Sequence, residues 1–83
     1  MKGRRIYSSS EMIAGDYYKM GNKEGNWLIC TPIGTRGMIN NTWNIEEHED
    51  GSITVSPSIR VWSNGDPKTN WHGYLIKGEW KEC

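Results

Sequence analysis

The chain has 83 residues, equal numbers of basic and acidic side chains, five tryptophans and four tyrosines, but no phenylalanine. A chain of this length forms one domain, residues 1–83, whose small core must be filled largely by aromatic rings. Zero net charge removes the broad positive field that attracts phosphate backbones, so nucleic acid is a disfavoured partner. No apolar run reaches the roughly 20 residues of a membrane span, and none follows the basic start as in a secretory signal. We therefore expect a cytoplasmic protein.

Glycine punctuates the chain, and the segments between the ten glycines are too short for stable helices. Short segments separated by turn residues predict an all-β domain. We expect a small antiparallel sheet of about five to six strands that curls on itself, or a barrel-like meander. The first half of the chain gives one helical turn over 9–13, a break at Thr31-Pro32, and strands at Arg5–Tyr7, Tyr17–Tyr18, Trp27–Cys30 and Met38–Ile39.

A hairpin is predicted over 42–62, because apolar and polar residues alternate along its second half. A two-residue turn would mix the two faces. A three-residue loop over 49–51, with a left-handed glycine as its third residue, keeps the faces separate. That loop pairs Ile45 with Val55 and Trp43 with Pro57. Since Pro57 cannot donate to a strand ladder, its stretch is expected at an edge or a bulge.

A second hairpin closes the chain, and two turns compete for it. A two-residue Lys77-Gly78 turn would place His72 opposite Cys83, close enough to share a metal ion. A three-residue loop over 76–78 instead pairs Tyr74 with Trp80 and spares Lys77 a positive φ. The apolar pattern favours the three-residue loop, which directs His72 and Cys83 to opposite faces.

Two motifs in these hairpins resemble a known family. Ser56-Pro57-Ser58-Ile59 and Trp71-His72-Gly73-Tyr74 are its most specific parts, and the similarity runs from Leu28 to the last residue. The chain resembles a small phage-associated protein family of unknown function, related to zinc-knuckle domains, with some members beside bacterial ubiquitin-like conjugation genes. The resemblance implies a β-fold and a phage-encoded protein. This chain departs from the zinc pattern, because 30–34 retains one cysteine and Trp71 stands where metal-type relatives carry Cys.

A metal site is considered at Cys30, His72 and Cys83, with His48 or water as a fourth ligand. Zinc takes thiolate and imidazole ligands in tetrahedral arrangement, but no Cys-x-x-Cys or His-x-x-x-His spacing supports the set. The alternative is a buried Cys30, a polar-tipped His72 and an unpaired Cys83. We favour this alternative, with no metal, and keep a zinc-stabilised accessory domain as a competing hypothesis.

A catalytic site is considered at His48, which lies among the carboxylates of 46–50. Neighbouring negative charge raises the pKa of a histidine and suits it to act as a general base. The spacing implies no nucleophile or oxyanion donor beside it, so a solvated acidic turn is favoured. No catalytic residues are therefore assigned, and the chain is not expected to be an enzyme.

The tryptophans suggest a binding role. Trp43 and Trp80 fit the core, which leaves Trp62 and Trp71 as an exposed pair that, with Tyr18, could anchor a partner. The leading hypothesis is a small non-enzymatic phage-type β-domain that binds another macromolecule, expected to be a host protein, and that can also associate with itself. A stacking module for single-stranded nucleic acid or sugar is the remaining alternative.

Overall fold

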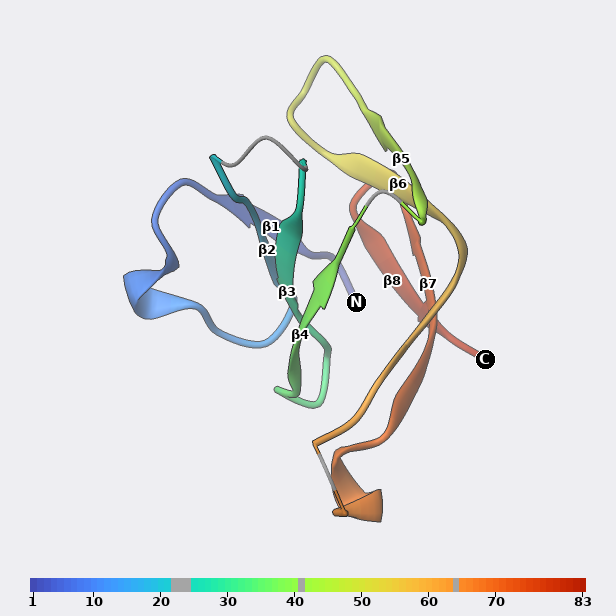
Figure 1. Ribbon diagram of the computed structural model, residues 1–83. Helices are drawn as coiled ribbons and strands as arrows, with labels where there is room; N and C mark the ends of the chain where they lie inside the picture. Colours follow the sequence, from blue (N-terminus) through green and yellow to red (C-terminus); the bar gives the residue numbers. More distant parts are fainter. Residues whose placement is uncertain (22–24, 41, 64) are drawn as a thin grey trace.

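The computed structural model describes residues 1–21, 25–40, 42–63 and 65–83. Within these residues the chain forms eight strands in two four-stranded sheets (Figure 1). The prediction of an all-β fold is confirmed. Two sheets replace the single curled sheet of five to six strands, and the described strands close no barrel. Both helical segments in the described chain are single 3-10 turns, far too short to cross a membrane.

The first sheet is built from the N-terminal half of the chain. Its strands β1 and β2 are parallel, and the other neighbours are antiparallel. Each strand expected in this half is present, and the helical turn is the 3-10 helix η1, which the Ser8 side chain caps. In sheet order the strands are β1 (Arg4–Ile6), β2 (Asp16–Lys19), β3 (Trp27–Cys30) and β4 (Arg36–Ile39), with η1 (Ser9–Glu11) between β1 and β2.

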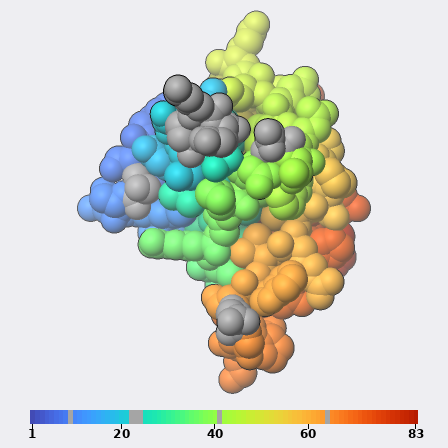
Figure 2. Space-filling model, viewed as in Figure 1, coloured from blue at the N-terminus to red at the C-terminus, as the bar shows by residue number. Residues whose placement is uncertain are grey.

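The second sheet is an antiparallel meander of the C-terminal half. Its strands in order are β5 (Asn44–Glu47), β6 (Ile53–Val61), β7 (Trp71–Ile76) and β8 (Glu79–Glu82). The connection from β6 to β7 carries the 3-10 helix η2 (Pro67–Thr69). This connection protrudes at the foot of the molecule, in orange in Figures 1 and 2.

The core lies between the two sheets. Aromatic and branched side chains of both sheets form one buried cluster, and three tryptophans belong to it. Gly37 on β4 lies against Val61 of β6, where an added Cβ would come within 2.7 Å of Val61 Cγ1. The buried members are Tyr17, Trp27, Ile29 and Ile39 from the first sheet, and Ile53, Val55, Ile59, Trp71, Leu75 and Trp80 from the second.

The central hairpin has the predicted loop. Gly51 adopts a φ of 89°, and Ile45 pairs with Val55. The ladder ends at Asn44, before the predicted pair of Trp43 with Pro57. Further along β6 the register with β7 shifts, so that residues 56–58 lie opposite Tyr74 alone. Pro57 was expected at an edge or a bulge, and it lies in a bulge. Its side chain is exposed, although the alternation had aligned it with the core residues.

The predicted turn of the closing hairpin is wrong. Ile76 pairs with Glu79 across a two-residue turn whose φ values are 49° at Lys77 and 78° at Gly78, and Leu75 pairs with Trp80 one step further from the turn. The two-residue turn suits the right-handed twist of the strands, and it buries Leu75 and Trp80 on one face. Thr54 stabilises the strained conformation of Lys77, because its hydroxyl accepts a hydrogen bond from the Lys77 N–H at 2.9 Å.

This turn also overturns the predicted separation of His72 and Cys83. The two residues are opposite each other in the register, and the Cys83 N–H donates to the His72 carbonyl at 3.0 Å. Tyr74, which was expected to share a face with Trp80, is 43% exposed, whereas Trp80 is 2% exposed.

Candidate active site

The outer face of β6 and β7 brings a serine and a histidine together. Ile59 of β6 and Gly73 of β7 are paired, and both are buried on the core face of the sheet. Because side chains alternate along a strand, Ser58 and His72 both point outward from neighbouring strands.

Ser58 and His72 are in hydrogen-bond contact. The Ser58 Oγ and His72 Nε2 atoms are 2.9 Å apart. Ser58 is half-buried and His72 is exposed, so the pair is accessible from solvent. In the described residues no carboxylate bonds to the other ring nitrogen of His72, so the arrangement is a dyad rather than a triad. A serine hydroxyl at this distance from imidazole can be activated as a nucleophile by proton transfer.

The bulge in β6 determines where Ser58 lies. Ordinary alternation would align Pro57 with the core residues, but the three residues opposite Tyr74 break that alternation, so that Pro57 is exposed and Ser58 is displaced along β6 relative to β7. The indole Nε1 of Trp43 donates to the Ser58 carbonyl at 3.3 Å. Trp43 itself packs against the core, so the backbone at Ser58 is tied to the rigid part of the molecule.

The Trp-His-Gly motif holds the other partner. The Trp71 ring is buried and meets Trp80 edge to face, with 5.3 Å between centroids. A Cβ at Gly73 would collide with the Lys81 carbonyl and the Trp71 ring, so a larger residue does not fit there. Two inward anchors therefore flank His72 and position its backbone on β7.

Ser58 is distinct among the serine side chains that the structure describes. Ser8 and Ser10 share a hydrogen bond with each other. Ser52 donates its hydroxyl to Asp50 at 2.6 Å, and this bond lowers the pKa of the Asp50 carboxyl. Of these described serines only Ser58 contacts a histidine, which makes it the candidate nucleophile.

A second histidine also contacts a hydroxyl. His48 Nε2 lies 2.7 Å from Thr54 Oγ1, at the base of the β5–β6 hairpin. Thr54 Oγ1 already accepts the backbone N–H of Lys77. This pair ties the two hairpins of the sheet together, and it offers a threonine rather than a serine.

The zinc set is not assembled. Cys30 is buried in β3 of the first sheet, and burial raises the pKa of its thiol, which disfavours the thiolate that binds metal. His72 points outward from β7, and only Cys83 is aligned with it. In the described part of the chain, no group of three or more His, Cys, Asp or Glu side chains could hold a metal ion.

The three predicted binding anchors are not gathered on one surface. Trp62 is 56% exposed, as expected, but the expected exposure of Trp71 is wrong, since it is 2% exposed in the core. Tyr18 is half-buried on β2 of the other sheet. Trp71 was misassigned because the face of β7 was inferred from the wrong turn.

Sequence reasoning missed the Ser58–His72 pair, although both residues lie in the motifs singled out. The pairing of β6 with β7 was not predicted from the sequence. A nine-residue connection, residues 62–70, separates these two strands in the sequence. One signal was available: Trp71, which was expected to be exposed, lies inward like Ile59, and alternation from these two residues would have placed Ser58 and His72 outward.

The comparisons with known proteins now bear on this pair. A family model described as "Bacterial ubiquitination-like system serine protease (BubE)" matches residues 7–83. No curated protein and no solved structure matches the chain. The match overturns the predicted phage-associated family, the non-enzymatic character and the host-protein binding role, because the family is one of bacterial serine proteases. The chain belongs to the BubE family of serine proteases of bacterial ubiquitination-like systems.

Proposed function

We propose that the protein is a serine protease in which Ser58 is the nucleophile and His72 is the general base. The observation that supports this proposal is the 2.9 Å contact between Ser58 Oγ and His72 Nε2 on an accessible strand face. The family supplies the reaction class, and among described serines Ser58 alone has a histidine partner.

The steps follow from the two side chains. Ser58 Oγ attacks the carbonyl carbon of the bond to be cleaved, and His72 Nε2 accepts the hydroxyl proton. The resulting imidazolium then protonates the leaving amine, which departs and leaves an acyl group on Ser58. His72 next takes a proton from water, which attacks the acyl group. The imidazolium then returns this proton to Ser58 Oγ as the bond between Oγ and the acyl carbon breaks, which releases the product acid and restores the dyad. His72 must therefore begin with Nε2 unprotonated and Nδ1 carrying the hydrogen.

In the described part of the chain, backbone packing rather than a third side chain positions the base. A carboxylate partner normally holds the histidine of a triad in its tautomer and orientation. Here the buried Trp71 and the closely packed Gly73 hold the strand on both sides of His72. The dyad lies on an open sheet face, and that exposure suits a protein substrate that covers the site when it docks.

The substrate class comes from the family. Its description places these proteases in bacterial ubiquitination-like systems. We propose that this chain cleaves an amide bond in a protein of such a system.

Covalent labelling tests the assignment without a known substrate. A small fluorophosphonate should modify the protein once, and peptide mass mapping should place the adduct on Ser58. Ser58→Ala should lower the labelling rate by at least about 10³-fold, because the nucleophile is lost. Ser56→Ala is the matched control from the same motif, and it should label like the wild type. Labelling at another serine, or undiminished labelling of Ser58→Ala, would refute the proposal.

A further inference from the structure

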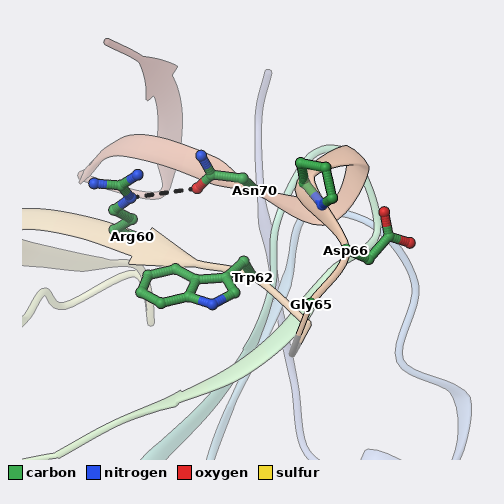
Figure 3. A pocket seen from close by; sticks show the side chains of 6 residues that line it. Arg60, Trp62, Gly65, Asp66 and Asn70 are labelled. Carbon is green, nitrogen blue, oxygen red and sulfur yellow. Dashed lines mark hydrogen bonds between the residues drawn. The ribbon is translucent and has the colours of Figure 1, made fainter.

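A pocket opens where β6 ends and the protruding connection begins (Figure 3). The cavity is about 300 Å³ in volume, and the residues that line it are Arg60, Trp62, Gly65, Asp66, Pro67 and Asn70. The proposed reaction uses none of them. The pocket is therefore a candidate binding site with a separate role from the reacting groups.

Arg60 gives the pocket a positive charge that the described residues do not neutralise. Its guanidinium lies over the Trp62 ring, 5.4 Å from the centroid, and its Nε donates to the neutral Asn70 side chain at 3.4 Å. Asp66 also lines the pocket, but its side chain points away from Arg60 in Figure 3 and caps η2 by accepting the Lys68 N–H. In the described chain, Arg60 forms no ion pair.

Arg60 relates the pocket to the dyad through the register of β6 and β7. Arg60 pairs with His72 across the strands, and it follows Ser58 by two residues on the same outward face. Two residues along a strand span about 6.6 Å, and four span about 13 Å. An extended substrate that runs along β6 from Ser58 has the same spacing. The substrate side chain two residues from the cleaved bond would thus reach Arg60. The substrate side chain four residues from the cleaved bond would reach Trp62.

We propose that this pocket is a specificity subsite of the Ser58–His72 protease and selects an acidic side chain two to four residues from the cleaved bond. The inference rests on the proposed function. Arg60 binds the carboxylate, because a guanidinium held on an aromatic face presents its free N–H groups outward. Trp62 orients Arg60 and packs against the aliphatic part of the acidic side chain.

Protection of Ser58 from labelling tests the subsite. The probe is the small fluorophosphonate, and the competitors are two pools of decapeptides that match except for Glu or Gln at one scanned position. The Glu pool should protect Ser58 at about fivefold lower concentration than the Gln pool, as expected of an exposed ion pair. Arg60→Gln should abolish the difference between the two pools, with protection in each protein measured relative to its own labelling rate without peptide. Lys81→Gln is the matched control, since it removes the same charge from an exposed position on β8 and should preserve the difference.

The outcomes separate the two proposals. Equal protection by the two pools, or no protection by either pool, would refute the subsite. Normal labelling of Ser58 in the same experiment would still support the dyad. A Glu preference that survives Arg60→Gln would also overturn it. Absence of labelling at Ser58 in the protein without peptide would instead refute the dyad, and the subsite with it.

Discussion

The two histidines of this protein each contact a hydroxyl, yet their surroundings differ. His72 meets Ser58 at 2.9 Å on the open face of β6 and β7, whereas His48 meets Thr54 at 2.7 Å beside two hairpin turns. Thr54 Oγ1 also accepts a backbone N–H, while Ser58 Oγ has His72 as its one partner in the described structure. Distance alone therefore does not identify a catalytic pair.

The difference lies in what else each hydroxyl does. A hydroxyl that satisfies a strained turn is committed to the fold, because moving it would leave the Lys77 N–H without its partner. The Ser58 hydroxyl has no such commitment, and its backbone is instead held through Trp43. We therefore propose that the His48–Thr54 pair is structural and the Ser58–His72 pair is reactive, and substitutions can test this comparison.

The largest difference is expected between the two histidines. His72→Gln should slow fluorophosphonate labelling of Ser58 by about 10²–10⁴-fold, because no base remains to take the hydroxyl proton. His48→Gln is the matched substitution at the other pair, and it should leave the labelling rate within about twofold of the wild type. Circular dichroism of both variants checks that the fold is retained. If the two variants lost reactivity equally, the distinction between the pairs would be wrong.

Much of the fold could be predicted because its signals are local. Glycine spacing excluded long helices, and alternation over β6 fixed the three-residue loop at Gly51. The turn of the closing hairpin was harder to predict from the sequence. A positive φ at a lysine is energetically unfavourable, so local conformational preferences disfavour the two-residue turn that the structure has. A contact from Thr54, 23 residues earlier in the chain, supports that conformation.

The site could not be predicted because it depends on the register between β6 and β7. That register shifts at the bulge around Pro57, and no local pattern gives the size of such a shift. The motif residues Ser58 and His72 were singled out, but without the register they remained two unrelated positions. The wrong turn then placed Trp71 outside and drew attention to a tryptophan that lies in the core.

A smaller effect, on stability rather than reactivity, is expected at the structural pair. Thr54→Val removes the acceptor of the Lys77 N–H and the partner of His48 while keeping a β-branched side chain. We expect a loss of about 1–2 kcal/mol in the free energy of unfolding, measured by urea denaturation, with the labelling rate of Ser58 retained. Thr54→Ser keeps the hydroxyl and should lose much less. Equal losses in the two variants would show that the hydroxyl contributes nothing.

The smallest effect is expected next to His48, at Glu47. Its carboxylate reaches from β5 to the first sheet, 2.8 Å from Lys19 Nζ and 3.2 Å from Arg5 Nη1. The Lys19 hydrogen bond is the main cause that lowers the pKa of Glu47, and Arg5 adds to it. Lys19 and Glu47 are exposed and Arg5 is half-buried, so solvent screens much of the attraction between these charges.

The pH dependence of stability tests this ion pair. Because the pKa of Glu47 is lower in the folded than in the unfolded chain, its stabilisation is present above about pH 4.3 and disappears as the pH falls through the folded pKa. Glu47→Gln should therefore reduce the free energy of unfolding by about 0.2–1 kcal/mol at pH 7 and by nothing near pH 2. Glu46→Gln is the control, since Glu46 forms no ion pair in the described chain. A Glu47 effect that persisted near pH 2, or an equal effect from Glu46→Gln, would show that burial or local propensity, and not charge, links this edge of β5 to the first sheet.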